Sequence, residues 1–287
     1  RIPEYISHAF HVAMSGRPGP VVLALPEDIL SSMADVADST PANPARQTVS
    51  QNAVAEVIDR LKVARNPMVI VGGGGWSAQA AKDLGSFAAA LGLPVGTSFR
   101  CQDYIDNRHP NYVGDVGIAP NPELATLVAK SDCILVLGAR LGEMTSGGYE
   151  LFDTPNPRQK IIHIHADPNE IGRVNRPEIG LACQSAEFLS TAIDLTAGQS
   201  AAPPAAPRAA YERWQQPFQT PGAVKMEQVI THASEVLPHD AIITNGAGNY
   251  AGWQHRYYCY KSYRTQLAPT SGSMGYGLPA AVAAKLA

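Results

Sequence analysis

Apolar residues are arranged along this chain in two alternating patterns: short continuous runs, and longer stretches with helical spacing. The continuous runs predict buried β-strands at residues 67–71, 94–98, 133–138, 160–166 and 180–184. The helically spaced stretches predict amphipathic helices at residues 51–64, 78–91, 122–130 and 185–196. Fully apolar strands that alternate with such helices are typical of a parallel sheet covered on both faces. We therefore predict a doubly wound, Rossmann-like α/β domain.

The segments on either side of this block predict smaller, partial α/β pieces. Residues 3–15 have the spacing of a helix, and VVLAL (21–25) predicts a short buried strand. The segment from residue 198 is rich in Ala and Pro, which predicts a semi-extended linker. After it, a helix over 224–237 and a strand over 241–245 are expected. The predicted division of the chain is 1–45, 46–197, 198–223 and 224–287.

Composition narrows the class of protein and its partners. Of the 287 residues, 45% are hydrophobic and 16% charged, and the net charge is −3, which is typical of a globular protein and not of one that binds nucleic acid or anionic membranes. No apolar run approaches the roughly 20 residues that span a bilayer. The four cysteines form no CxxC pair, which favours reduced thiols in a cytoplasmic protein. The chain begins without Met and ends within a helical pattern, so we expect it to be a piece of a longer protein.

A glycine-rich segment, GGGGWS (72–77), follows the first strand of the block and opens a helix. Bare backbone at Gly73 and Gly74 can approach a phosphate, and a helix N-terminus favours an anion. The third glycine of the NAD fingerprint is replaced by Ser77, and no acidic residue ends the next strand. The alternatives are another nucleotide or a purely structural turn.

Two further strand ends carry polar residues. GARLGEMTSGG (138–148) places Arg140 where it could pair with a phosphate or flavin, or lie on the surface. In IIHIHAD (161–167), His163 and His165 point to one face, which suits a metal or simply a polar strand end, and no third ligand is evident. Asp167 follows the strand and is placed for a ribose or adenine contact.

The C-terminal quarter contains two glycine-rich turns. NGAGNYAGW (245–253) follows a predicted strand, and its glycines and asparagines suit a loop around a polar ligand. The next segment, WQHRYYCYKSYR (253–264), interleaves aromatic and basic residues, a mixture also found in proteins that bind single-stranded nucleic acid. Since the chain as a whole is weakly acidic, a packed wall of an active site or subunit is the better interpretation. TSGSMGYGLPAA (270–281) forms the second turn.

Taken in order, these motifs resemble the thiamine diphosphate (ThDP)-dependent enzymes of the acetolactate synthase-like family. AFHVAMSGRPGPVVLALPEDI (9–29) resembles the end of their pyrimidine-binding domain, and PMVIVGGGG through IIHIHADPNEIG resembles their central domain. NGAGNYAGW and TSGSMGYGLPAAVAA resemble the start of their diphosphate-binding domain. The resemblance covers nearly the whole chain. It implies a lyase or transferase that decarboxylates or ligates 2-keto acids, with Mg²⁺ as a second cofactor.

The resemblance also implies roles for particular residues. Gly272 offers its backbone carbonyl to the exocyclic amine of the aminopyrimidine, and Met274 lies under the bent cofactor, with Ser273 between them. An unbranched apolar side chain can lie between the two rings without adding a competing base. Asn249 and Tyr250 stand where family members contact the diphosphate.

The resemblance likewise locates functional residues outside this chain. The proton-relay glutamate of the family lies before Arg1, and the segment that holds Mg²⁺ lies after Ala287, so we expect no catalytic residue and no metal ligand among these residues. A diphosphate without its metal is poorly held, and the chain alone is therefore expected to be inactive and to bind ThDP weakly. In the central domain, FAD or ADP is possible at Gly73, Gly74, Arg140 and Asp167. GIAPN (117–121) departs from the flavin pattern of the family.

The resemblance leaves the substrate open among pyruvate, an aromatic 2-keto acid and an acyl-CoA. Relatives are homodimers or homotetramers with active sites between subunits, so an oligomer is expected. A different class of protein, a stand-alone nucleotide-binding module with a regulatory or scaffolding role, is the alternative. A metal hydrolase that uses His163, His165 and Asp167 is a third hypothesis.

Overall fold

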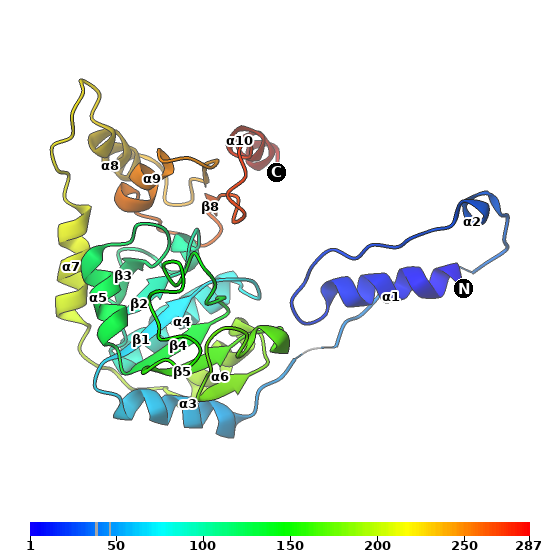
Figure 1. Cartoon of the computed structure of the whole chain (residues 1–287), viewed down its shortest axis with the longest axis horizontal. Helices are drawn as coiled ribbons and strands as arrows, with labels where there is room; N and C mark the ends of the chain where they lie inside the picture. Colours follow the sequence, from blue (N-terminus) through cyan, green and yellow to red (C-terminus); the bar gives the residue numbers. More distant parts are fainter. Residues whose placement is uncertain (38–39, 46) are drawn as a thin grey trace.

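The computed structural model describes residues 1–37, 40–45 and 47–287, and its centre is a six-stranded parallel sheet (Figure 1). The strand order is β3-β2-β1-β4-β5-β6, so the chain reverses direction along the sheet between β1 and β4. Ligands of open α/β sheets bind at such a switch point, at the carboxyl ends of the strands. The strands are β1 (Pro67–Val71), β2 (Val95–Thr97), β3 (Tyr112–Asp115), β4 (Cys133–Leu137), β5 (Lys160–Ile164) and β6 (Ile179–Leu181).

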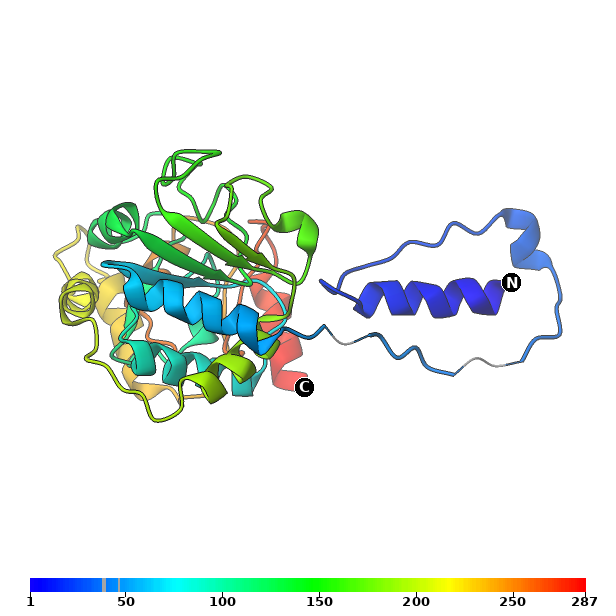
Figure 2. The same ribbon diagram turned by 90° about the horizontal axis from the view of Figure 1, so that it is seen from below.

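Helices cover both faces of this sheet, as predicted (Figure 2). The helices α3 (Gln51–Val63), α4 (Ala78–Leu91) and α6 (Ser185–Leu195) bury one face in a continuous apolar core. The helix α5 (Pro122–Lys130) and the loop after β4 bury the other face. In β1, Val69 and Val71 point into the first core, whereas Met68 and Ile70 point into the second. Burial on both faces explains why β1 is apolar throughout.

The predicted helices and strands of this block are confirmed with shifts of a few residues. The predicted last strand, 180–184, begins and ends earlier, as β6. The sequence pattern missed β3, which lies between the predicted strand 94–98 and α5, because its glycine and polar residues interrupt the apolar run. The short helices η1 (Gln102–Tyr104) and η2 (Pro168–Glu170) follow β2 and β5.

The N-terminal segment extends away from the sheet domain (Figures 1 and 2). It contains α1 (Ile2–Met14), as predicted, and the short α2 (Glu27–Ser31), and none of the residues in these helices is buried. The predicted strand 21–25 is wrong, since these residues are extended, exposed and unpaired in the part of the chain that the structure describes. An apolar run needs a neighbouring strand to form a ladder, and here none adjoins it.

The semi-extended linker predicted for 198–223 is also wrong in part, because it contains α7 (Ala205–Gln215). The helix buries Ala210 and Tyr211 beside β3 and α5, and Tyr211 meets the ring of Tyr112 edge-on at 5.0 Å. Its alanines favour a helix despite the prolines at its start, which fit a first turn. The linker is therefore fastened to the sheet domain.

The remaining residues form a small second unit. It contains α8 (Met226–Val236), β7 (Ile243–Thr244), α9 (Ala251–Tyr257), β8 (Gln266–Leu267) and α10 (Gly277–Leu286). The strands β7 and β8 pair in parallel, so their carboxyl ends lie at one edge. No helix in the described ranges is long and apolar enough to cross a membrane.

Candidate functional site

The two glycine-rich turns of the C-terminal unit lie together at the carboxyl ends of β7 and β8. The hydroxyl of Thr244 donates to the Gly277 carbonyl at 2.9 Å, and a Cβ on Gly277 would lie 3.0 Å from the Gly246 nitrogen. The start of α10 therefore approaches the end of β7 at backbone contact, which a glycine accommodates without displacing its neighbours. The sequence motifs predicted each turn separately, and the structure brings them side by side.

The first turn is stabilised from within. The Gly246 N–H donates to the Tyr250 hydroxyl at 2.8 Å, and the Gln254 amide donates to the Asn245 side chain at 3.1 Å. Tyr250 keeps 56% of its surface exposed, and Asn249 is exposed as well. Both predicted contact residues are accessible to a ligand, although the hydroxyl of Tyr250 already accepts a bond from the turn.

The second turn leaves its backbone open. Gly272 has φ +72°, and a Cβ there would meet nothing within 4 Å. Its N–H donates to the Pro269 carbonyl at 3.0 Å, which closes the turn. Ser273 is exposed, and Met274 is 87% exposed, although a thioether of this size is usually buried. An open backbone beside an exposed apolar side chain suits a flat, partly polar ligand.

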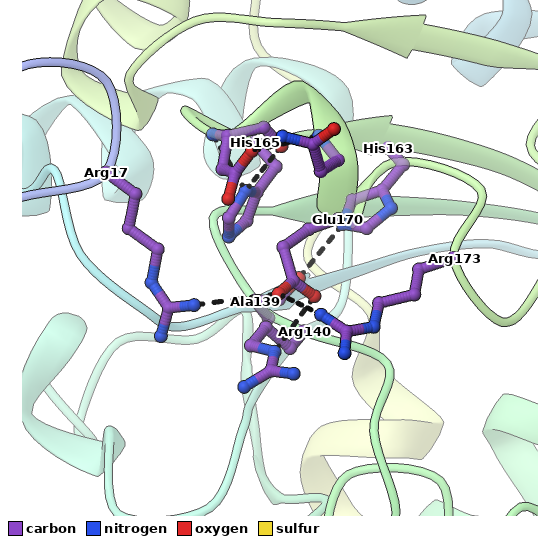
Figure 3. Close-up of polar contacts among 9 residues, drawn as sticks. Arg17, Ala139, Arg140, His163, His165, Glu170 and Arg173 are labelled. Atoms are coloured by element: carbon purple, nitrogen blue, oxygen red, sulfur yellow. Dashed lines mark hydrogen bonds and ion pairs between the residues drawn. The ribbon is translucent and has the colours of Figure 1, made fainter.

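A second polar cluster lies at the carboxyl end of β5, around Glu170 (Figure 3). The Glu170 side chain is only 7% exposed and accepts from Arg140 Nε at 2.9 Å and Arg173 at 3.0 Å, while Arg17 approaches to 3.6 Å. Three guanidinium groups around one carboxylate leave an excess of positive charge. The cluster also fastens the N-terminal segment through Arg17, and beside it Gln184 donates to the Gly16 carbonyl at 2.5 Å.

The two histidines of β5 have separate local partners. His163 Nε2 lies 3.0 Å from the Ala139 carbonyl, and burial lowers its pKa to about 4. His165 accepts from the Asp167 N–H at 3.0 Å, and burial lowers its pKa too. The Asp167 carboxylate accepts both the backbone and side-chain N–H of Asn169 and thereby caps η2. Within the described residues, no group of three or more His, Cys, Asp or Glu side chains is arranged to hold a metal.

The glycine-rich segment after β1 packs tightly at the switch point. A Cβ on Gly73 would lie 1.9 Å from the Gly138 carbonyl, and the Gly73 carbonyl accepts from the Tyr104 hydroxyl at 2.5 Å. Trp76 donates to the Gly72 carbonyl at 2.9 Å, and its ring lies tilted against that of Tyr104, with 5.0 Å between the ring centroids. Gly74 is exposed, with open space around it. The fold itself therefore requires the glycine at position 73.

Sequence reasoning missed three residues that organise these sites: Arg17, Glu170 and Arg100. Arg17 lies in the motif SGRPG, and Glu170 lies in the motif HADPNE. Their opposite charges, in motifs far apart in the sequence, were the signal that could have predicted the ion pair. Arg100 ends the strand region SFR and gave no signal, because its partners are backbone carbonyls about 150 residues away.

Comparison with known proteins places these features in one family. The profile described as "Thiamine pyrophosphate enzyme, central domain" matches residues 54–191, and "Thiamine pyrophosphate enzyme, C-terminal TPP binding domain" matches residues 246–287. The chain therefore belongs to the thiamine pyrophosphate enzymes; thiamine pyrophosphate is another name for ThDP. The first match spans the parallel sheet, and the second spans both turns at β7 and β8.

Within that family, the chain is similar to acetolactate synthases. It is 30% identical to acetolactate synthase 1, chloroplastic, of Oryza sativa subsp. japonica over 100% of this chain and 46% of that protein. It is 28% identical to the large subunit from Corynebacterium glutamicum, over 99% of this chain and 47% of that protein. The fold is that of a benzoylformate decarboxylase from Polynucleobacter necessarius, with a TM-score of 0.74 and 20% identity, over 99% of this chain and 52% of that one. The chain spans about half the length of the curated relatives it matches.

The Glu170 carboxylate is expected to stabilise the fold, because it is the shared partner of three guanidinium groups. Replacing Glu170 with Gln keeps the shape but leaves three guanidinium groups without their carboxylate, so we expect the free energy of unfolding to fall by about 1–2 kcal/mol. Urea unfolding at low and high salt measures it. Glu178→Gln is the control, since Glu178 also meets two cations, Arg60 at 3.2 Å and Lys160 at 3.6 Å, but is more exposed. Equal losses in the two variants would contradict a special role for Glu170.

Proposed function

We propose that this chain is part of a ThDP-dependent enzyme that decarboxylates or ligates a 2-keto acid. One observation carries the proposal: two turns whose sequences match the TPP-binding domain lie at one sheet edge, with open backbone at Gly272 and an exposed apolar side chain at Met274. Bound ThDP supplies a thiazolium that takes up electrons when the carbon dioxide of a 2-keto acid is lost.

The residues of this chain would bind and orient that cofactor. Gly272 and Ser273 present open backbone to the aminopyrimidine, and Met274 supplies an apolar surface below it. Asn249 and Tyr250, at the start of α9, stand toward the diphosphate. The space at Gly272 and the donors of the first turn fit such a cofactor. The 287 residues contain no Gly-Asp-Gly segment, so Mg²⁺ would need ligands from elsewhere in the protein.

The remaining parts of the proposal concern organisation. We assign residues 1–45 to the end of a pyrimidine-binding domain, 46–197 to the central domain, 198–223 to a linker and 224–287 to the start of a diphosphate-binding domain. The exposed apolar side chains of α1 favour further protein against that helix, in keeping with a homodimer or homotetramer. A cytoplasmic location is proposed, although relatives include chloroplastic enzymes.

A nucleotide such as FAD or ADP at Gly73, Gly74, Arg140 and Asp167 stays a prediction, and the contacts of these residues weigh against it. Arg140 is bound to Glu170, Asp167 caps η2, and Gly73 presses on Gly138. Gly73 and Gly74 are both exposed, but of these two glycines Gly74 has open space around it. A stand-alone nucleotide-binding module is therefore the weaker proposal.

Titration of the purified chain with ThDP and Mg²⁺, followed by amide chemical shifts, tests the proposed function. Because a diphosphate without fixed metal ligands is poorly held, we expect affinity of only about millimolar strength, with shifts confined to residues 245–250 and 270–277. ADP and FAD serve as matched competitors. Tighter binding of either nucleotide than of ThDP, with shifts around Gly73 and Arg140, would favour the nucleotide-binding module instead.

A further inference from the structure

Arg100 is a buried cation at the boundary between the sheet domain and the C-terminal unit. Arg100 follows β2, is 8% exposed, and has a backbone φ of +60°, a conformation that is unfavourable for a residue other than glycine. Burial lowers its pKa. In the described part of the chain, no carboxylate lies within ion-pair distance of it. An unpaired buried charge is costly, so its presence calls for an explanation.

The guanidinium contacts both turns of the candidate cofactor site at once. One terminal nitrogen donates to the Gly246 carbonyl at 3.2 Å, and the other donates to the Pro269 carbonyl. Gly246 belongs to the turn after β7, and Pro269 belongs to the turn after β8. The Phe99 ring packs against the guanidinium, with 4.6 Å between the Arg100 carbon Cζ and the ring centroid.

The peptide groups that Arg100 holds have their N–H groups on the far side. In a trans peptide the N–H points opposite to the C=O, so the N–H groups of Ala247 and Thr270 point away from Arg100. Gly246 and Pro269 are buried, whereas Ala247 is half-buried and Thr270 is exposed. Neither amide donates to another residue that the structure describes. The result is a pair of free donors on the open side of the turns.

We propose that Arg100 is a positioning residue that holds these two turns together and aims the N–H groups of Ala247 and Thr270 at the acceptor-rich cofactor; this rests on the proposed function. The positive charge also polarises both peptide groups, which makes their N–H groups better donors to a diphosphate or a ring nitrogen. Arg100 itself touches no part of the ligand.

Docking of the two units does not depend on Arg100. Asp103 accepts the backbone N–H of Thr265 at 2.9 Å and of Gln266 at 3.1 Å, and Asn107 accepts the N–H of Tyr260 at 2.9 Å. These bonds fasten the same loop to the C-terminal unit independently. Loss of the Arg100 side chain should therefore loosen the two turns and leave the interface in place.

Amide hydrogen exchange on Arg100→Met and Arg100→Lys, in the full chain, tests the hold on the turns. Because Arg100→Met loses two hydrogen bonds from a charged donor, exchange at the Gly246 and Gly272 amides should accelerate roughly tenfold or more. Lys should restore part of the protection. Arg108→Met is the control, because Arg108 lies in the same loop and is exposed and paired with Asp106. Exchange in β1 and β4 should stay unchanged.

The ligand side of the proposal is tested with millimolar ThDP and Mg²⁺. The amide shifts of Ala247 and Thr270 should respond in the unmodified chain and in Arg108→Met, and should lose that response in Arg100→Met. Equal exchange in Arg100→Met and Arg108→Met overturns the proposal. If exchange accelerates but ThDP shifts other amides and not those of Ala247 and Thr270, their role as donors is overturned and the proposed function stands. Accelerated exchange with no ThDP response anywhere overturns the proposed function and leaves the hold of Arg100 on the turns.

Discussion

Replacing Gly73 with Ala is expected to destabilise the protein by about 3 kcal/mol. Two costs add. The residue has φ +71°, which disfavours any side chain by roughly 1–2 kcal/mol. The new Cβ would also lie 1.9 Å from the Gly138 oxygen and 2.9 Å from its carbon, and a backbone contact can be relieved only by moving β1 and β4 apart, for roughly 1–3 kcal/mol more.

The neighbouring glycine supplies the matched control. A Cβ on Gly74 meets nothing within 4 Å, and its φ lies outside the left-handed region, so Gly74→Ala should change the free energy of unfolding by less than about 0.5 kcal/mol. Urea unfolding of both variants measures the difference. A loss from Gly74→Ala as large as that from Gly73→Ala would show that the segment is sensitive as a whole, and the contact with Gly138 would not be the cause.

The sheet domain was predictable from sequence because its strands are buried on both faces, and this burial leaves a pattern of apolar residues within each short segment. Each strand of the core is apolar throughout, and each covering helix repeats apolar residues on one face, so length and period identify them. The strand β3 was missed since Gly114 and Asp115 break the apolar run. The helix α7 was missed because alanine and proline composition describes a linker equally well, and tertiary contacts such as that of Tyr211 with Tyr112 decide between the two.

The candidate cofactor turns were predictable for a different reason. Glycines at Gly272 and Gly275 are needed for positive φ, and such residues form a recognisable motif along the chain. The elements that hold the turns could not be predicted. Arg100 acts on carbonyls of Gly246 and Pro269, and a backbone carbonyl carries no sequence signature. The strand predicted at 21–25 fails for the opposite reason. Its apolar pattern is that of a strand, but no described residue pairs with it.

Asp115 should make stability depend on pH in an unusual direction. The carboxyl ends β3 and accepts one bond, from the Gly117 N–H at 3.0 Å, and burial raises its pKa to about 7. It lines a cavity of about 220 Å³ with His255 and Arg256, but that guanidinium packs on Trp214, 3.7 Å from the ring centroid. The carboxyl therefore keeps its proton to a higher pH in the folded protein than in the unfolded chain, and no cation pairs with it among the described residues.

The sign follows from proton binding in the two states. Between about pH 4 and pH 7 the folded protein keeps the Asp115 proton while the unfolded chain has lost it, so stability falls as pH rises through this window. Asp115→Asn removes that penalty and can still accept from Gly117. We expect the variant to equal the unmodified protein at about pH 4 and to exceed it by about 2–4 kcal/mol at pH 8. Urea unfolding across this range measures the difference.

Asp132→Asn is the control with the opposite sign. Burial acts against ionisation of Asp132, but the N–H groups of Arg65 and Asn66, each at 2.8 Å, lower its pKa overall. That variant should therefore be less stable than the unmodified protein at pH 8, and the loss should shrink as the pH falls toward the pKa of the folded carboxyl. His163, with a pKa of about 4, contributes equally to all three proteins and cancels in the differences. A constant difference between Asp115→Asn and the unmodified protein at every pH would mean that Asp115 is ionised in the fold, with its charge compensated inside the cavity.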